Sequence, residues 1–414
     1  MAPTNGTDPG QSATKTTSSR KCGNLKNCHP GSAVGAIRDL TQPSTKTTNP
    51  KAHRLMNILL LSAYHSASHR YWCEGLMAAF LEHNWTLRSQ PARHFSWRIE
   101  ASGWLWALGD DAAFQQSYDL IIATSLTQVV TLKAQCPALR DVPLWLYFHE
   151  NQFAHPLSNQ QQAAHQTAWQ FKSLENAFCA DWISFNTHFN RDTFFAGAEK
   201  LLKKFPEIIP GDPLTKLKQR SDVLAVPLSD RFSVLREQEK DSRLIVWNHR
   251  WEWDKQPQRF LNALIKLKQN NADFRLAMLG SGGGRGEVYA QERQLLNEQV
   301  VHWGEASESE YEYWLGRAGI GVSTSLHDFQ GLAMLELAQA GATCIVPRRQ
   351  AYPECLPAAV FFDGNEQDAS EEETELAATL SNCLGQSTRQ HPLPLSWSEL
   401  QTGYRQIIER LAAV

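Results

Sequence analysis

The sequence predicts an α/β fold with two domains, each a parallel sheet covered by helices. Short, continuous apolar runs alternate with stretches of helical apolar spacing, the pattern of strands buried on both faces and of the helices between them. This alternation stops in a charged, irregular segment at residues 227–242 and then starts again. With 414 residues, the chain is long enough for two domains that each have a core.

The expected strands fall into two sets. Those of the first half are residues 55–62, 118–123, 143–148, 181–185 and 222–226, with helical patterns such as 163–179 between them. Those of the second half are residues 243–247, 274–279, 300–303, 320–323 and 342–346. We interpret 227–242 as a linker that joins the domains near residue 230.

This pattern divides the chain into four parts. Residues 1–53 have no apolar periodicity and are rich in Thr, Ser, Gly, Pro, Lys and Asn, so we expect a disordered basic tail. Residues 54–228 are expected to form an N-terminal domain, and residues 229–395 a C-terminal domain. The amphipathic segment 396–414 is expected to form a helix that packs back toward the N-terminal domain.

Composition narrows the class of protein. The net charge of −3 gives the whole chain no basic field for nucleic acid, although eight of the 40 Lys and Arg residues lie in the first 54 positions. No stretch of about 20 apolar residues predicts a membrane span, and no signal-peptide core is visible. The eight cysteines show no CxxC spacing, which favours reduced thiols and a cytoplasmic location. Oligomeric state is not readable from these features.

Residues 317–341 read as a strand, a loop and a helix. Gly331 stands where the helix begins, so the free N–H groups of its first turn can approach a bound oxyanion. Asp328 precedes that point and Glu336 follows it on the helix, and carboxylates accept hydrogen bonds well from sugar hydroxyls. A plain βα unit, with its acidic residues placed only by the helix dipole and solvent, remains the alternative.

Polar residues also follow two strands of the first half. His149, Glu150, Asn151 and Gln152 come directly after the strand 143–148, at the sheet edge where ligands collect in parallel sheets. A solvated loop has the same composition. The loop after the first strand contains Ser66, Ser68 and His69, where the histidine either faces a ligand or caps the next helix.

The strand 243–247 is followed by a pair of cations. Arg250 can donate two parallel N–H hydrogen bonds to a phosphate, and Lys255 supplies a mobile positive charge, so together they suit a diphosphate. The alternative is that they pair with Glu252 and Asp254 on the surface. A glycine-rich loop begins at Gly280, and its spacing matches neither a dinucleotide fingerprint nor a P-loop.

Several motifs are absent from the sequence. No Asp-x-Asp occurs, so the usual metal clamp for a sugar nucleotide is missing, and neither G-x-S-x-G nor H-E-x-x-H is found. We therefore expect no metal and no cofactor, with a leaving diphosphate neutralised by Arg250, Lys255 and the helix terminus at Gly331.

A basic stretch interleaved with aromatics is the candidate RNA-binding segment. Arg93, Trp97 and Arg98 lie in it, and such side chains stack on unpaired bases. The alternative is that the tryptophans are core residues and the arginines are solvated.

With these residues in place, the chain resembles glycosyltransferase family 4. The resemblance rests on Arg250 and Lys255, the loop at Gly280, and the acidic pair that brackets FQGLAML, where Asp328 stands in the place of the family's usual Glu. Within the family it is similar to the tRNA-queuosine mannosyltransferase group. The strings that carry this similarity are SASHR at 66–70, RHFSWRIEASG at 93–103, YFHENQFAHP at 147–156, WNHRWEWDKQP at 247–257, SLHDFQGLAMLE at 325–336 and AYPE at 351–354.

The resemblance implies a GT-B fold, two facing Rossmann-like domains with a deep cleft between them, in which residues 54–228 form the acceptor domain and residues 229–395 the nucleotide-sugar donor domain. It also implies transfer of mannose from GDP-mannose to the cyclopentenediol of queuosine in the anticodon of tRNA-Asp, with retention and without a metal. The alternatives are a family 4 enzyme with a glycan, lipid or small-molecule acceptor, and an inactive module that binds a sugar nucleotide or RNA.

The resemblance also assigns roles by position. The implied catalytic residues are His149, Arg250, Lys255 and Asp328. The implied donor-binding residues are Arg250, Lys255, Gly280, Ser325, Asp328, Phe329, Gln330, Gly331, Leu332 and Glu336, with Glu336 on the ribose. Combined with the segments above, the acceptor-binding candidates are Ser68, His69, Arg93, Trp97, Arg98, Glu150, Asn151 and Gln152.

Overall fold

The computed structural model describes residues 54–109, 111–155, 160–207, 209–282, 284–386 and 393–413, without the side chains of 160–165. The tail expected at residues 1–53 lies outside the described part. Everything reported below belongs to one compact unit of the chain.

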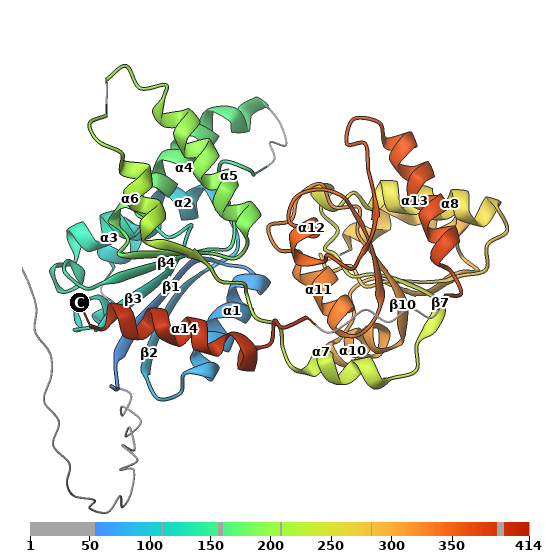
Figure 1. The fold of residues 1–414 in the computed structure, drawn as a ribbon, viewed down its shortest axis with the longest axis horizontal. Coiled ribbons are helices and arrows are strands. Elements are labelled where there is room, and N and C mark those ends of the chain that lie inside the picture. The colour runs from blue at the N-terminus through green and yellow to red at the C-terminus, as the bar shows by residue number, and fades with distance from the viewer. Residues whose placement is uncertain are drawn as a thin grey trace, which may run out of the picture. The chain divides into compact units, whose positions relative to one another are not determined.

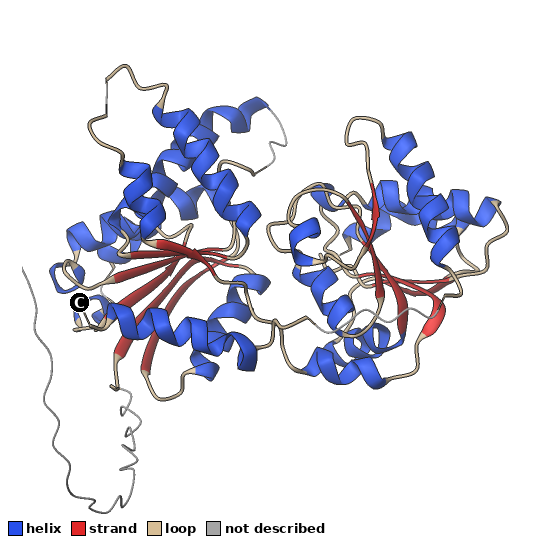
Figure 2. Ribbon diagram, in the orientation of Figure 1, coloured by secondary structure: helices blue, strands red, loops and turns tan. Residues whose placement is uncertain are grey.

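The first half of the described chain folds around a six-stranded parallel sheet with the order β2-β1-β3-β4-β5-β6 (Figures 1 and 2). Its strands are β1 (Asn57–His65), β2 (Asn84–Pro91), β3 (Leu120–Thr124), β4 (Leu144–Phe148), β5 (Trp182–Phe185) and β6 (Ser221–Val223). Strands β3, β4 and β5 are buried along their whole length, as expected for central strands with helices on both faces.

The second half repeats this plan. Its sheet is also six-stranded and parallel, with the order β12-β11-β10-β7-β8-β9. Its strands are β7 (Asp241–Trp247), β8 (Arg275–Met278), β9 (Val300–Trp303), β10 (Ala318–Val322), β11 (Thr343–Pro347) and β12 (Val360–Phe362).

Helices cover both faces of each sheet (Figure 2). On the first sheet, α3 (Val129–Gln135), α4 (Gln160–Cys179), α5 (His188–Leu202) and α6 (Pro213–Gln219) cover one face, and α1 (Ala67–Ala79) covers the other. Helix α2 (Phe95–Ala107) packs against α3 and α4. On the second sheet, α8 (Pro257–Gln269) and α13 (Ala369–Cys383) lie on one face, and α7 (Arg231–Val234), α10 (Glu308–Arg317), α11 (Leu332–Gln339) and α12 (Tyr352–Cys355) on the other. The short α9 spans Ala290–Leu295.

Each half has two hydrophobic cores, one on each face of its sheet, and alternate side chains of a strand pack into one core or the other. In β4, Leu144, Leu146 and Phe148 join the core under α3 to α6, while Trp145 and Tyr147 join the core under α1. Every residue of this strand is therefore apolar, which is the continuous run visible in the sequence.

The last helix, α14 (Trp397–Leu411), belongs to the core of the first half. Trp72 of α1 donates its indole N–H to the Tyr404 hydroxyl at 3.0 Å, and Tyr404 donates in turn to the carbonyl of Ala225. The chain returns to this half beside the segment by which it left, because the N–H of Leu228 donates to the carbonyl of Leu395. Figure 1 shows α14 beside α1.

The structure differs from the sequence expectations in two places. Strands β2 and β12 were not expected, because β2 is an edge strand of mostly half-exposed polar residues and β12 has only three residues. The segment 227–242, expected to be irregular, contains α7 and a short 3₁₀ helix, because Phe232 and Leu235 of this charged stretch are buried in the second core. No helix in the described ranges is both long enough and apolar enough to cross a membrane.

Candidate active site

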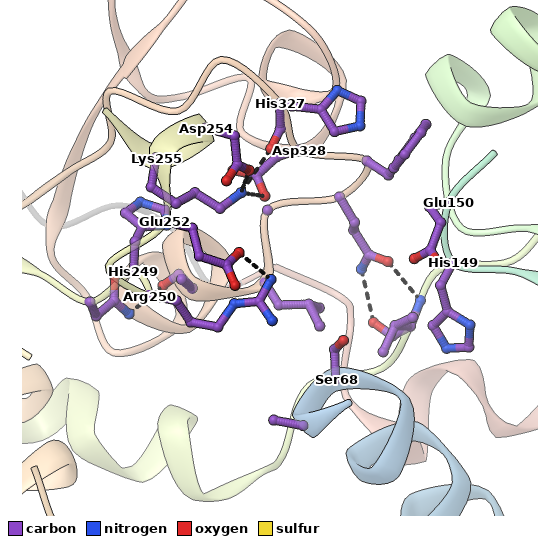
Figure 3. A pocket seen from close by; sticks show the side chains of 18 of the residues that line it. Ser68, His149, Glu150, His249, Arg250, Glu252, Asp254, Lys255, His327 and Asp328 are labelled. Carbon is purple, nitrogen blue, oxygen red and sulfur yellow. Dashed lines mark hydrogen bonds and ion pairs between the residues drawn. The ribbon is translucent and has the colours of Figure 1, made fainter. Parts of the chain in front are cut away.

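A cavity of about 660 Å³ lies where loops from the carboxyl ends of strands in both sheets meet (Figure 3). From the first half it is lined by residues at the start of α1 and after β4, β5 and β6: Ala67, Ser68, His149, Glu150, His155, Asn186 and Val226. From the second half it is lined by residues after β7, Arg285, and the loop from β10 into α11: Asn248 to Lys255, Arg285, and His327 to Ala333. The ends of parallel strands are the usual place for a ligand site in such folds.

Lys255 is the most enclosed cation of this cavity. Its ammonium group lies 2.9 Å from the Asp328 carboxylate and 3.1 Å from that of Asp254, and it donates to the His327 carbonyl at 2.8 Å. Burial alone would lower the pKa of Lys255, but these two carboxylates raise it above its usual value. The amine is therefore fixed and charged at neutral pH.

Arg250 is half exposed and lies 2.9 Å from the Glu252 carboxylate (Figure 3). The pairing with Glu252 and Asp254, raised above as an alternative to phosphate binding, is thus present in the structure. Both cations nevertheless line the cavity, so a bound diphosphate can reach them by replacing a carboxylate partner.

Asp328 is held by two donors. Besides Lys255, it accepts a hydrogen bond of 2.6 Å from the Tyr352 hydroxyl, which also lies 2.7 Å from the Ser323 hydroxyl. Burial would raise the pKa of Asp328, but Lys255 and the bond from Tyr352 hold it well below its usual range. The carboxylate therefore stays ionised, with a fixed orientation beside the start of α11.

Gly331 caps α11 with a left-handed backbone, φ 74°. A Cβ at this position would stand 2.7 Å from the Tyr352 ring, so any other residue would meet both strain and a clash. The first N–H groups of a helix have no partner within it, and Leu332 and Ala333 line the cavity.

The loop before α11 is fastened to the first half of the chain. Gln330 makes two hydrogen bonds with the backbone of Val226, at 3.0 and 2.9 Å. The Thr187 hydroxyl donates to the carbonyl of Phe329 at 2.8 Å. These bonds fix the position of the Phe329 to Leu332 backbone at the cavity wall.

Three residues expected at the donor are absent from the cavity lining, although Glu336 is partly exposed. Glu336 accepts a hydrogen bond of 2.5 Å from Tyr311, and burial raises its pKa to about 7. Ser325 is fully buried, where its hydroxyl accepts from Lys255. Gly280 packs against Trp251, whose indole N–H donates to the Gly280 carbonyl, and a Cβ there would collide with the indole.

The wall supplied by the first half holds the candidate acceptor residues nearest to the cavity. Ser68, His149 and Glu150 line it, and His69 lies behind them with its Nε2 3.8 Å from the Glu150 carboxylate. The His149 ring packs edge-on against His69, with 4.3 Å between the ring centroids. Burial raises the pKa of Glu150 to about 7 and lowers that of His69 to about 3.

Other expected acceptor residues lie away from the cavity lining. Asn151 is buried. Its amide nitrogen donates to Asn190 and Thr193, and its amide oxygen accepts from the N–H groups of Phe153 and Ala154. Gln152 is likewise buried, with 1% of its surface exposed. Arg93 and Trp97 are exposed near the start of α2, and Arg98 on that helix donates to Gln90.

The structure adds two residues that the sequence analysis did not single out. His249 lines the cavity among Arg250, Lys255 and Asp328, and burial lowers its pKa to about 4. Tyr352 donates a hydrogen bond to Asp328. His249 lies inside the string that contains the two cations, which is a signal that could have found it, whereas Tyr352 is distant in sequence from Asp328.

The arrangement suits chemistry on an anionic donor. It offers the cations Arg250 and Lys255, free N–H groups at a helix start and a fixed carboxylate, which together can hold a diphosphate and orient the hydroxyls of an attached sugar. In the described part of the chain, no group of three or more His, Cys, Asp or Glu side chains is placed to hold a metal ion.

Solved structures share this architecture. A glycosyltransferase from Rickettsia africae superposes with a TM-score of 0.56 at 12% identity, over 87% of this chain and 99% of that chain. An Anabaena protein in complex with UDP and glucose gives a TM-score of 0.52 at 12% identity, over 87% and 100%. Residues 230–382 match the family model of glycosyl transferases group 1. The chain therefore has the GT-B fold, and it is a glycosyltransferase.

The first half of the chain shows a more specific similarity. Residues 57–228 match the family model for the N-terminal region of tRNA-queuosine alpha-mannosyltransferases. The tRNA-queuosine alpha-mannosyltransferase of Drosophila melanogaster is 27% identical over 314 residues, which cover 73% of this chain and 82% of the relative. The chain is therefore similar to tRNA-queuosine alpha-mannosyltransferases, which confirms the resemblance stated from its sequence strings.

Proposed function

We propose that this glycosyltransferase moves mannose from GDP-mannose to the cyclopentenediol of queuosine in the anticodon of tRNA-Asp, with retention and without a metal. The observation that carries the proposal is the make-up of the cavity. The wall of the cavity that contains Glu150 belongs to the region that matches tRNA-queuosine alpha-mannosyltransferases. The wall that contains Lys255 belongs to the region that matches glycosyl transferases group 1.

The donor part of the proposal is supported by the charges after β7 and before α11. Arg250 and Lys255 neutralise the diphosphate as it leaves, together with the first N–H groups of α11. Asp328 accepts hydrogen bonds from the sugar hydroxyls, and Glu336 from the ribose. Retention requires the acceptor hydroxyl to approach the anomeric carbon from the face that the diphosphate leaves.

The acceptor part is supported by the other wall. Glu150 and Ser68 face the cavity, and the exposed Trp97 and Arg93 offer stacking and phosphate contacts outside it. A cytoplasmic location agrees with the six cysteines of the described residues, all of which are free thiols.

The test is incubation of the protein with GDP-mannose and queuosine-containing tRNA-Asp, followed by mass spectrometry of the nucleosides. We expect a gain of one hexose on queuosine, none with tRNA that lacks queuosine, and no loss of activity in a metal chelator. NMR of the anomeric signal reports whether the configuration is retained. No gain of a hexose, alongside measurable GDP binding, would contradict the acceptor.

A matched pair of variants connects the activity to the cavity. Arg250→Ala should lose most of the transfer, whereas Arg243→Ala, at the opposite end of β7 and paired with Asp273 at the surface, should keep it. Equal activities of the two variants would remove Arg250 from the donor site.

A further inference from the structure

Three ring nitrogens around Glu150 have no hydrogen-bond partner among the described residues. They are Nε2 of His69 and both ring nitrogens of His149, and all three are buried. Both histidines are more than nine-tenths buried, with 2% and 7% of their surfaces exposed. Buried polar groups are almost always paired in folded proteins, because each unpaired one costs about 1–3 kcal/mol.

The neighbouring Asn151, by contrast, is fully paired. All the hydrogen bonds of its side chain amide are made inside the protein, where they hold the loop to α5. The amide nitrogen of Gln152 on the same loop is also buried without a hydrogen-bond partner among the described residues, but His149 is the one of these two that lines the cavity, where a bound ligand can pair with it.

The charges that face Glu150 come from several elements. His69 lies on α1, Arg250 follows β7, and Tyr64 near the end of β1 is close enough to interact with Glu150, Arg250 and Glu252. Burial raises the pKa of Glu150 to about 7, although Arg250 opposes the shift. The carboxyl therefore exchanges a proton near neutral pH.

We propose that Glu150 is a catalytic residue that binds the acceptor diol and takes the proton of the attacking hydroxyl. In this step the hydroxyl oxygen bonds to the anomeric carbon and its proton passes to the Glu150 carboxylate. The bond from the anomeric carbon to the diphosphate breaks, and its electron pair leaves with the nucleoside diphosphate. The two oxygens of a carboxylate can accept from both hydroxyls of a vicinal diol. The inference rests on the proposed function and names the residue that receives its acceptor.

His69 acts as a positioning residue for Glu150. Its Nδ1 lies 2.8 Å from the Ser66 hydroxyl, and that hydroxyl lies 3.1 Å from Ser68 at the cavity. A hydroxyl proton donated to Nδ1 leaves the ring proton on Nε2, the nitrogen that faces Glu150. At 3.8 Å the N–H of this nitrogen stabilises the charged form of the Glu150 carboxylate. The separation exceeds hydrogen-bond length, so the carboxylate oxygens remain free for the acceptor.

The experiment measures single-turnover transfer, GDP affinity and hydrolysis of GDP-mannose by water, from pH 5.5 to 9. The proteins are the wild type, Glu150→Gln, Glu150→Asp and His69→Phe, with Glu175→Gln, an exposed glutamate of α4 paired with Lys172, as the control. In the wild type we expect kcat/KM to rise with pH through about 7, because the base must be deprotonated.

Glu150→Gln should slow transfer roughly 10²- to 10⁴-fold at unchanged GDP affinity and lose that rise. Glu150→Asp should recover part of the rate. His69→Phe should move the rise to higher pH, which a merely structural role would not do. Glu175→Gln should match the wild type.

Transfer by Glu150→Gln within threefold of the wild type, or an unchanged rise with pH, would overturn the inference. Hydrolysis separates the two proposals, because water must also lose a proton when it attacks. If the wild type hydrolyses GDP-mannose but does not modify queuosine, the proposed acceptor is wrong, and the loss of hydrolysis in Glu150→Gln still supports the role of Glu150. Unchanged hydrolysis in that variant, or a wild type with neither activity, would overturn the role of Glu150.

Discussion

The two walls of the cavity hold their charged groups in different ways. On the wall from the second half, Lys255 lies between Asp254 and Asp328, and Arg250 pairs with Glu252. On the wall from the first half, Glu150 lies 3.8 Å from His69, which burial keeps uncharged at neutral pH by lowering its pKa to about 3.

The difference shows how each wall meets its ligand. A paired wall is preorganised, so a diphosphate that binds there exchanges one set of charge contacts for another at little cost in reorganisation. The carboxyl of Glu150 has no charged partner at ion-pair distance among the described residues and is free to accept hydrogen bonds from a ligand. We therefore expect variants of the paired wall, and of the residues that hold it, to affect folding as well as binding, and variants of exposed residues outside the cavity to affect binding alone.

The largest effect is expected for Lys255→Ala. Loss of one member of a desolvated charge pair costs roughly 2–5 kcal/mol, so kcat/KM should fall on the order of 30-fold to several thousand-fold. The variant also leaves Asp254 and Asp328 without their cation, which should lower the unfolding free energy by about 3–5 kcal/mol. Transfer kinetics and urea unfolding measure the two losses.

Lys203→Ala is the control for this prediction, since Lys203 is exposed and pairs with Glu199 on α5. The double variant Lys255→Met, Asp328→Asn should recover part of the stability but no activity, because one unpaired carboxylate is removed while the phosphate contact stays lost. A stable, active Lys255→Ala protein would show that neither the stability nor the activity of the protein depends on the ion pairs of this wall.

Glu336→Gln should weaken nucleotide binding roughly tenfold, because a hydrogen bond to a charged group contributes about 1.5–3 kcal/mol and each 1.4 kcal/mol is a factor of ten.

The effect of Glu336→Gln on the stability of the protein should depend on pH. Burial raises the pKa of Glu336 from 4.5 to about 7, so the stability it contributes is full below pH 4.5 and is lost as pH rises through 7. Relative to the wild type, the variant should thus be more stable at pH 8.5 than at pH 5. Calorimetry with GDP and urea unfolding at both pH values check this, and unchanged GDP affinity would remove Glu336 from the ribose.

Tyr352→Phe removes one of the two donors to Asp328 and should cost about 1–2 kcal/mol of unfolding free energy. The pKa of Asp328 is depressed, so its contribution to stability is present above its unfolded pKa and is lost as pH falls. The variant raises that folded-state pKa only in part, so its excess loss over the wild type should stay constant from pH 7 down to the acid range in which Asp328 itself is protonated. Tyr313→Phe, an exposed tyrosine of α10, is the control. A loss at pH 7 no larger than that of the control would contradict the role of Tyr352.

The smallest effect is expected for Trp97→Ala. This side chain is 65% exposed, so the unfolding free energy should stay within about 0.5 kcal/mol of the wild type. Loss of a stacked base should weaken tRNA binding by about 1 kcal/mol, roughly fivefold. Leu81→Ala, another exposed apolar residue, should leave tRNA binding unchanged. Equal tRNA affinities of the two variants would place the docking surface elsewhere.

The fold could be predicted from the sequence where burial is continuous. Central strands such as β3 and β4 are buried on both faces, so their apolar runs are unbroken. The edge strand β2 has one free side and polar residues, and its sequence NWTLRSQP carries no such signal. The buried residues of α7 show the reverse case, a charged segment whose few apolar side chains pack into a core.

The site could be predicted where its residues are neighbours in sequence. Arg250 and Lys255 share one loop, and Asp328 and Gly331 another, and all four line the cavity. Their catalytic roles stay predictions. The contacts that hold them in place come from distant residues, such as Tyr352 on Asp328 and Val226 on Gln330. Only the folded topology brings these groups together, so periodicity and spacing could not reveal them.

The position of α14 sets an order for the folding of the chain during synthesis. The first core needs Tyr404 on Trp72, and Trp397 lies directly against Gly75, where a Cβ would collide with the indole. A ribosome therefore makes the whole of the second half before the first half can close its hydrophobic face. Until residues 397–411 emerge, the apolar surface of α1 stays open to water or to chaperones, so a stop codon near residue 390 should impair the half of the protein synthesised first.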